Sequence, residues 1–469
     1  MSILPRLIAG ASSLALAACA TTGPSLSPPQ VPAAAQAPFV EARSPGVVGA
    51  VPREDWWRLY NDPVLDALVQ QALAANKDIA VAVANLDAAR ASLRAARGDR
   101  LPQTDVNGGA QYGRPSGLER APGQHADWAL SAGLNLAYEV DLFGRVRNNV
   151  RAARADVSAA EADRDAVRVE VAAETARAYA DILSSERELE VARRTVGLLD
   201  QSVTLSQKRF DAGRTSGLDV ARITALRDQQ RARIPDFQAQ LDSATFRLAT
   251  LTGHPPAERP IANGSGPALS LTQPIPIGDG RLLLARRPDV RAAERRLAAA
   301  SARVGVATAD LYPRITLGGS LAASATSIAS LFTGGALGLI AGPLLNWSFL
   351  NQETARARVA GSEAQSRGEL ARFDKTVLTA LQETETTLSR YSNQIRRREA
   401  LLSAADQAER AARITRAQLR EGRADNLAVL DAERTLAQAQ ADLAEADSSL
   451  VDAQIEVFKA LGGGWQTST

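Results

Sequence analysis

The sequence is poor in the residues from which most enzyme and metal sites are built. Its 469 residues include one cysteine, two histidines and one methionine. A single cysteine excludes an intrachain disulfide and a cysteine-based metal site, and His125 and His254 have no partner at the spacing of metal ligands. We also find no Walker loop, dinucleotide fingerprint, nucleophile elbow or zinc motif, so we expect neither an enzyme nor a bound cofactor.

Aromatic residues and an excess of one charge are also scarce. Phe, Trp and Tyr make up 4% of the chain, whereas hydrophobic residues make up 45%. The apolar material is therefore mainly Ala, Val and Leu, which suits long, closely packed helices better than one globular core. The formal net charge is +2, with acids and bases interspersed. The sequence has no basic patch that would indicate nucleic acid as a partner, and no acidic tail that would indicate cation binding.

The lone cysteine closes a short export signal. Arg6 precedes an apolar stretch over 7–16, which ends in Leu16-Ala17-Ala18-Cys19. This run resembles a bacterial lipobox, which implies that residues 1–18 are a signal peptide and that Cys19 is acylated. Ala20 rather than Asp follows, which in such lipoproteins implies sorting to the outer membrane. The alternative is an ordinary signal peptide with a chance cysteine. The Pro- and Ala-rich residues 19–52 are predicted to tether the lipid to the folded body.

The body of the chain repeats itself at an offset of about 210 residues, which predicts two copies of one unit. The matching landmarks are Asn76-Lys77-Asp78-Ile79 with Arg287-Pro288-Asp289-Val290, and Gly213-x4-Leu218-x-Val220 with Gly422-x4-Leu427-x-Val429. We therefore predict a first repeat over 53–254, a linker over 255–277, a second repeat over 278–464 and a tail over 465–469.

Each repeat is expected to contain a helix, two strands, a very long helix, a turn and another helix. In the first repeat, 65–97 reads as one Ala-rich helix, and from 130 to 142 the even positions are apolar while polar residues alternate with them. The uncharged run 315–352 is long enough for a membrane-spanning helix. Pro343, the paired glycines and the alignment with the first repeat favour strand, loop and strand instead.

The long helices carry a seven-residue apolar repeat. Residues 147–211 contain no proline, and a helix of this length extends for roughly 100 Å. Apolar residues recur every seven positions at Ile182, Leu189, Val196, Val203 and Phe210, and again at Val429, Leu436, Leu443, Leu450 and Val457. This spacing predicts coiled-coil packing.

Four strands cannot close a barrel by themselves. Unpaired strand edges are excluded from the lipid core, and membrane barrels begin at eight strands. The amphipathic strands therefore predict that several protomers pool them in an oligomeric tube.

Ordered landmarks in both repeats carry a family resemblance. They are the lipobox, Trp56-Trp57-Arg58-Leu59-Tyr60-Asn61-Asp62-Pro63, Tyr138-Glu139-Val140-Asp141-Leu142-Phe143-Gly144-Arg145, Arg286-Arg287-Pro288-Asp289-Val290 and the two Gly-x4-Leu-x-Val turns. Together they resemble the outer membrane factor family, in its NodT and OprM-like lipoprotein branch, with TolC as a more distant relative. Trp56, Trp57 and Tyr60 also fit a packing role alone.

The resemblance implies a mostly α protein with membrane β-barrel strands. It implies a homotrimer with a twelve-stranded barrel in outer-membrane lipid and a helical barrel in the periplasm, where it meets an adaptor protein and an inner-membrane pump. The implied function is efflux of small molecules through this tube. The sequence does not encode the cargo, because a conduit needs no substrate pocket.

The resemblance also implies a periplasmic gate at the two helical turns. Asp431 matches a constriction aspartate, and Asp219 matches a tip residue that links to a basic partner, here Arg423 or Arg420. TolC has a second acid where this chain has Ala428, and Asp425 is the candidate substitute. The turns themselves, at Gly213, Leu218, Gly422 and Leu427, are the expected adaptor contacts. The alternatives are a capping pair between Ser216 and Asp219 and a solvated helix face at Asp431.

A rival function belongs to a different class. A periplasmic coiled-coil adaptor or scaffold lipoprotein would also carry long helical hairpins. It would not need four alternating strands placed symmetrically in two repeats, so we favour the channel.

Overall fold

The computed structural model describes residues 32–114, 125–258, 269–271 and 273–463. Cys19, the signal peptide and the tail lie outside the described residues, so acylation of Cys19 stays a prediction. The described chain forms two compact units, and each unit draws on both sequence repeats. We call them the sheet unit, with residues 85–161 and 292–373, and the helical unit, with residues 32–84, 162–291 and 374–463.

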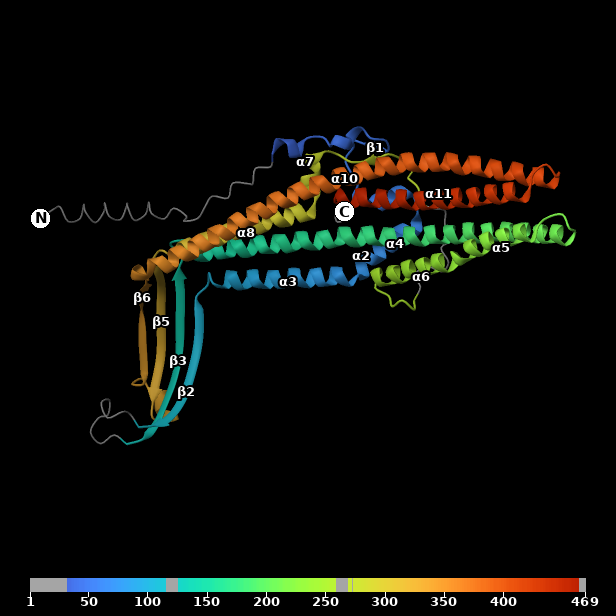
Figure 1. The fold of residues 1–469 in the computed structure, drawn as a ribbon. Helices are drawn as coiled ribbons and strands as arrows, with labels where there is room; N and C mark the ends of the chain where they lie inside the picture. The colour runs from blue at the N-terminus through green and yellow to red at the C-terminus, as the bar shows by residue number, and fades with distance from the viewer. Residues whose placement is uncertain (1–31, 115–124, 259–268, 272, 464–469) are drawn as a thin grey trace. The chain divides into compact units, whose positions relative to one another are not determined.

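The sheet unit contains one antiparallel sheet with the order β2-β3-β5-β6 (Figure 1). Its strands are β2 (Gln103–Gly113), β3 (Asp127–Val140), β5 (Arg314–Ala325) and β6 (Leu337–Asn346). The β3–β5 pair joins the two repeats. Pro343 lies on the edge strand β6, where its missing N–H is tolerated. The run 315–352 is thus strand, loop and strand, as predicted. No helix in the described part of the chain is long and apolar enough to cross a membrane.

Short and long helices flank the strands. They are α3 (Lys77–Gly98), α4 (Arg145–Asp211), α8 (Pro288–Ala309), α9 (Ile328–Leu331), η4 (Phe349–Asn351) and α10 (Gln352–Arg420). The start of α4 is fixed by the acidic residues just before it. The Asp141 carboxylate accepts hydrogen bonds from the backbone N–H groups of Val146 at 3.0 Å and Arg147 at 2.8 Å. Glu139 accepts two from the Arg145 guanidinium, at 2.7 and 2.6 Å.

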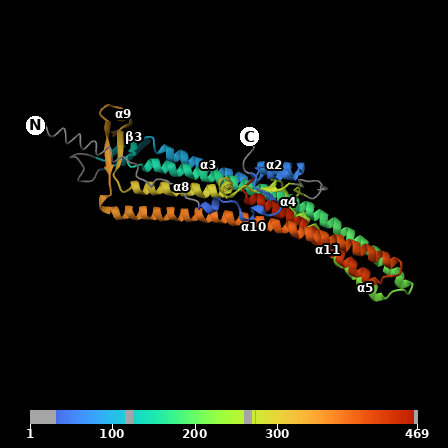
Figure 2. The same cartoon turned by 90° about the horizontal axis from the view of Figure 1, so that it is seen from above.

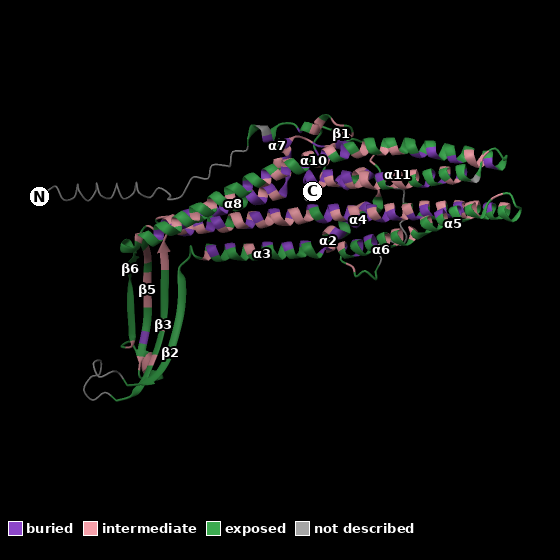
Figure 3. Cartoon of the chain, viewed as in Figure 1, coloured by how far each residue is buried: buried purple, intermediate pink, exposed green. Residues whose placement is uncertain are grey.

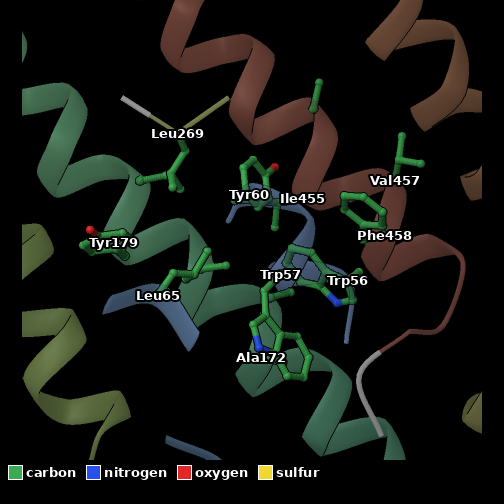
Figure 4. Close-up of a cluster of buried hydrophobic side chains, with 14 of the residues drawn as sticks. Trp56, Trp57, Tyr60, Leu65, Ala172, Tyr179, Leu269, Ile455, Val457 and Phe458 are labelled. Carbon is green, nitrogen blue, oxygen red and sulfur yellow. The ribbon is translucent and has the colours of Figure 1, made fainter. Parts of the chain in front are cut away.

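The helical unit holds the largest core. Its further elements are η1 (Ala33–Gln36), η2 (Val40–Arg43), β1 (Val47–Val48), η3 (Trp56–Tyr60), α2 (Pro63–Ala75), α5 (Gly217–Ala232), α6 (Ile234–Leu251), β4 (Ile275–Pro276), α7 (Gly280–Arg286) and α11 (Asn426–Ala460). In the core, Trp56 stacks on Phe458 with ring centroids 4.8 Å apart (Figure 4). Trp57 and Tyr60 are also buried, and the Tyr60 hydroxyl donates to Gln454 at 3.1 Å. The aromatic motif of the sequence therefore has a packing role.

The heptad stripe of α4 is buried over its first half. Ile182, Leu189 and Val196 are buried, whereas Phe210 at the end of the helix is exposed. The same stripe on α11 is buried at Val429, Leu436 and Val457. Figure 3 shows mostly exposed residues at the turns that join α4 to α5 and α10 to α11. The coiled-coil packing predicted from the spacing is consistent with this pattern.

One predicted helix is two helices. The prediction of a single helix over 65–97 was wrong, because α2 ends and α3 begins at Asn76. Asn76 has an extended backbone, and its side-chain oxygen accepts a hydrogen bond from the Asp78 N–H at 2.8 Å, as an N-cap does. The last helix of the first repeat is also divided, into α5 and α6, at Arg233 just before Pro235. Proline cannot donate the backbone hydrogen bond that would continue α5.

The described end of the predicted tether is packed on the helical unit. Phe39 is buried, and the N–H groups of Val40 and Glu41 donate to the two carboxylate oxygens of Glu385 at 2.7 and 3.2 Å. Strand β1 pairs in parallel with β4 of the predicted linker. Residues 32–52 are therefore not a free tether, which corrects the expectation for this stretch. The proline-rich composition of this stretch could not show that its backbone N–H groups bond to Glu385 or that it pairs with β4.

Each repeat closes on itself at a similar joint. The Asn76 side chain donates to the Leu251 carbonyl at 3.1 Å, so the start of α3 is tied to the end of α6. At the matching position of the second repeat, the Arg287 guanidinium donates to the Ala460 carbonyl at 3.0 Å, which ties α8 to the end of α11. Arg287 also pairs with Glu383 of α10 at 2.8 Å. These repeat joints were not foreseen, although both residues lie in the landmark that revealed the repeat.

Candidate functional site

The sheet has one apolar and one more polar face. Cross-strand pairing places exposed apolar side chains in one row, with one residue from each strand: Val106, Leu134, Leu321 and Leu339. The neighbouring row, on the opposite face, holds Asp105, Asn135, Ser320 and Ile340. We call the first side the apolar face. Alternating faces of this kind are typical of membrane barrels, whose outer surface contacts lipid and whose inner surface contacts water.

Aromatic side chains lie near both ends of the apolar face. Tyr112 and Trp128 pair across β2 and β3 with ring centroids 5.5 Å apart, and both are exposed. Tyr138 lies on the same face toward the other end of β3. At about 3.4 Å per residue and a tilt of about 40°, the segment from Trp128 to Tyr138 spans roughly 26 Å of membrane. This height matches the apolar band of outer-membrane barrels, which is flanked by aromatic girdles.

The other candidate site is the tip, where α4 turns into α5 and α10 turns into α11 (Figure 2). Gly213 and Gly422 follow the two long helices with φ of +68° and +75°. In both turns the glycine N–H donates to the carbonyl three residues back, and the next N–H to the carbonyl five residues back. This is the Schellman ending, in which a left-handed residue favours glycine. The exposed Leu218 and Leu427 lie just beyond the turns.

Two of the three predicted tip acids take part in helix capping. The Asp219 carboxylate accepts hydrogen bonds from Thr215 at 2.8 Å and from the Ser216 hydroxyl at 2.9 Å, and these bonds lower its pKa. The reciprocal bond from the Asp219 N–H to Ser216 completes a capping box. Asp425 caps α11 by accepting from the Ala428 N–H at 2.8 Å. The capping interpretation of Ser216 and Asp219 is therefore confirmed, and a gating role for Asp219 would come in addition to it.

Asp431 is different from these two acids. It lies more than a turn inside α11 and is exposed. In the described part of the chain no hydrogen bond or ion pair engages its carboxylate. The basic candidates are also exposed, and Arg423 pairs with Glu421 at 3.4 Å. The structure of one chain does not bring Arg423 or Arg420 to Asp219, so that link stays a prediction.

Two further arginines organise the tip and were not foreseen. The Arg209 guanidinium, near the end of α4, donates to the Leu419 carbonyl near the end of α10 at 3.1 Å. Arg416 of α10 forms an ion pair with the buried Glu433 of α11, with one N–O distance of 2.8 Å. An apolar heptad predicts that these helices pack but gives no signal for the charged pairs between them.

Comparison with known proteins tests the resemblance. The family model of the outer membrane efflux proteins matches residues 68–254 and 280–463. The chain belongs to the outer membrane efflux protein family. Among its relatives, the pyoverdine export outer membrane protein OpmQ of Pseudomonas aeruginosa is 32% identical over 426 residues, which are 88% of each chain. Outer membrane protein OprJ of the same species is 31% identical over 97% of this chain and 94% of its own.

Solved structures agree with this family assignment. The outer-membrane channel OprN is 34% identical and superposes with a TM-score of 0.90, covering 96% of this chain and all of that one. The expected mostly α fold with barrel strands is therefore confirmed. Like other outer membrane efflux proteins, the chain is the outer-membrane component of an efflux system and works as a homotrimer with a periplasmic adaptor and an inner-membrane pump. Its relatives are transport proteins and not enzymes.

Proposed function

We propose that the tip formed by the ends of α4, α5, α10 and α11 is the periplasmic gate of this efflux channel. The observation that carries the proposal is Asp431. The carboxylates of Asp219 and Asp425 accept the hydrogen bonds of helix caps, whereas Asp431 lies beyond the cap and its carboxylate has no hydrogen bond or ion pair with the described residues. In a trimer, three such carboxylates near the axis repel one another and attract cations, so they form an acidic constriction.

The glycine turns and the exposed leucines beside them form the surface that an adaptor would contact. Leu218 and Leu427 are both more than half exposed, although they are large apolar residues next to tightly capped turns. The link between Asp219 and Arg423 or Arg420 would then run between neighbouring protomers, because the hydrogen bonds that the Asp219 side chain accepts from described residues of its own chain all end on Oδ2. Adaptor binding at the leucines would loosen this link.

The other parts of the chain have roles that follow from this placement. The lipobox makes Cys19 the acylated first residue, which holds the trimer in the inner leaflet of the outer membrane. The chain acts as a conduit with no chemistry of its own, and the inner-membrane pump selects the small molecules that pass through it.

Single-channel conductance in planar bilayers tests the gate. We expect Asp431→Ala to raise the conductance of the closed channel and to weaken its preference for cations, because the ring of charge is gone. Asp442→Ala is the matched control, since Asp442 lies on the same helix, farther from the tip, and accepts a hydrogen bond from Gln438 at 2.7 Å. A closed state that is unchanged in Asp431→Ala would remove Asp431 from the gate.

A further inference from the structure

The loop between β5 and β6 differs from an ordinary water-facing hairpin loop. It contains the short helix α9 and carries no charged residue, as the uncharged run continues from 315 to 352. The loop at the same end between β2 and β3 carries Arg114, Glu119 and Arg120. Two loops at one end of the same sheet therefore have opposite chemistry.

Large apolar side chains of the α9 loop are left uncovered. Phe332 is 82% exposed and Ile328 is 72% exposed. Isolated exposed apolar residues need no explanation, but these two are one helical turn apart and follow an exposed strand face that is itself apolar. Leu337 continues the apolar surface on the other side of the loop.

The loop folds back over the apolar face of the sheet. Helix α9 contacts both β5 and β3 (Figure 2). Ala323 is the buried residue of β5, and Ala325 is partly covered, whereas Ala322 and Ser324 on the other face are exposed. Pairing places Ala323 opposite Leu337 and Ala132, in the alternation of the apolar face. Helix α9 therefore lies on the side of the sheet that contacts lipid.

Helix α9 begins at about the same height along the strands as the pair of Tyr112 and Trp128. The β3–β5 pairing ends at Leu130 and Ala325, two residues from Trp128 and two from Ser327, where α9 is capped. Tyr112 and Trp128 mark the membrane–water interface at this end, since aromatic rings concentrate at that level. A helix that begins here and carries apolar side chains lies at the same interface.

Three hydroxyl groups of the loop form hydrogen bonds within it. The hydroxyls of Ser327 and Ser330 lie 2.7 Å apart, and each bonds the other residue's backbone N–H. The Thr333 hydroxyl donates to the Ser330 carbonyl at 2.7 Å. Internal satisfaction of backbone and hydroxyl groups is what a segment near hydrocarbon requires, because lipid tails offer no hydrogen bonds.

We propose that the α9 loop is a lipid-binding element, which inserts Ile328 and Phe332 into the acyl-chain boundary of the leaflet at that end of the barrel. The occupant of this surface is lipid rather than protein, because the surface is continuous with the lipid-facing side of β5 and β6. The inference rests on the membrane placement of the sheet. The loop would fix the depth of the barrel in the membrane, as interfacial apolar helices do.

Spin-label accessibility in vesicles of phosphatidylethanolamine and phosphatidylglycerol tests this proposal. Single labels are placed by Phe332→Cys and Ile328→Cys, with Leu339→Cys as the lipid-facing reference and Ile340→Cys as the reference on the opposite face. The parent protein taken through the same labelling is the blank. We expect labels at 328 and 332 to match 339, with several-fold higher access for oxygen and lower access for a water-soluble nickel chelate than at 340.

Other outcomes would overturn the proposal in distinguishable ways. Labels at 328 and 332 that match 340 would place the loop in water. Labels there that are shielded from both reagents would show a contact with another protein copy instead of lipid. If 339 and 340 themselves behaved alike, the placement of the sheet would fail, and the inference about α9 with it. Two label positions and circular dichroism of each variant separate these results from misfolding.

Discussion

The repeat joint at Arg287 offers a quantitative test of how the second repeat closes on itself. Arg287→Met keeps the length and the apolar stem of the side chain but removes the guanidinium. Three acceptors lose a donor: the Ala460 carbonyl at 3.0 Å, Asp289 at 2.7 Å and Glu383 at 2.8 Å. The change breaks the contact that links α8, α10 and α11.

The expected loss is set mainly by the carbonyl. Ala460 is buried, and a buried acceptor left without its donor costs about 1–3 kcal/mol. Asp289 and Glu383 are 41% and 50% exposed, so water replaces the guanidinium and each ion pair contributes no more than about 1 kcal/mol. The free energy of unfolding should therefore fall by about 3 kcal/mol. Arg287→Lys should recover only part of it, because an ammonium cannot reach three acceptors in a fork.

Heat-induced loss of the helical circular dichroism signal of the detergent-purified trimer measures the effect. The matched control is Arg187→Met, because Arg187 pairs with Glu190 at 2.8 Å but both side chains are about two-thirds exposed. We expect a clear drop in the midpoint for Arg287→Met and almost none for Arg187→Met. Equal midpoints for the two variants would refute the role given to the joint.

Two further changes test the core and its charges. Trp56→Ala removes the stack on Phe458 and should lower the free energy of unfolding by about 3–5 kcal/mol. The melting midpoint should therefore fall further for Trp56→Ala than for Trp56→Phe. Equal falls would contradict the packing. Burial of one carboxylate oxygen and the nearby Asp181 raise the pKa of Asp452 to about 6. The folded state therefore takes up a proton that the unfolded state does not as pH falls from 7 toward 4, and stability should rise over that window. Asp452→Asn should remove this rise and should increase the free energy of unfolding at pH 7.5 by about 1 kcal/mol. The gain is no larger because the Asp452 side chain is two-fifths exposed and water screens its charge. A loss of stability at pH 7.5 would contradict the predicted direction of the effect.

The periodic elements could be predicted from sequence because their cause is local. Alternation from 130 to 142 placed β3, and the heptads placed the buried stripe of α4 and α11, since side-chain direction follows directly from strand and helix geometry. The repeat placed the second pair of strands even though an uncharged run hid them.

The break at Asn76 was harder to predict because part of its cause is a tertiary partner. Asn76 has ordinary helix neighbours, and its side chain both caps α3 and bonds the end of α6. The fold-back of α9 and the clamp of Glu385 on residues 40 and 41 likewise join segments that sequence spacing does not relate.

The tip was predicted in position but not in detail. The two glycine turns were expected from the repeat, and the structure gives both the same left-handed ending. The spacing of Ser216 and Asp219 also indicated the capping box. Arg209 and Arg416 could not be found in this way, because a charge on a long helix has no periodic signature that distinguishes a partner from solvent.

Mass measurement of the full-length protein, extracted from outer membranes in detergent and analysed by light scattering corrected for the micelle, tests the central claim most directly. A channel that pools four strands from each chain should give about three times the 49.5 kDa of one chain. A monomer that stays in solution without detergent would contradict the pooled barrel and return the chain to the class of periplasmic adaptors.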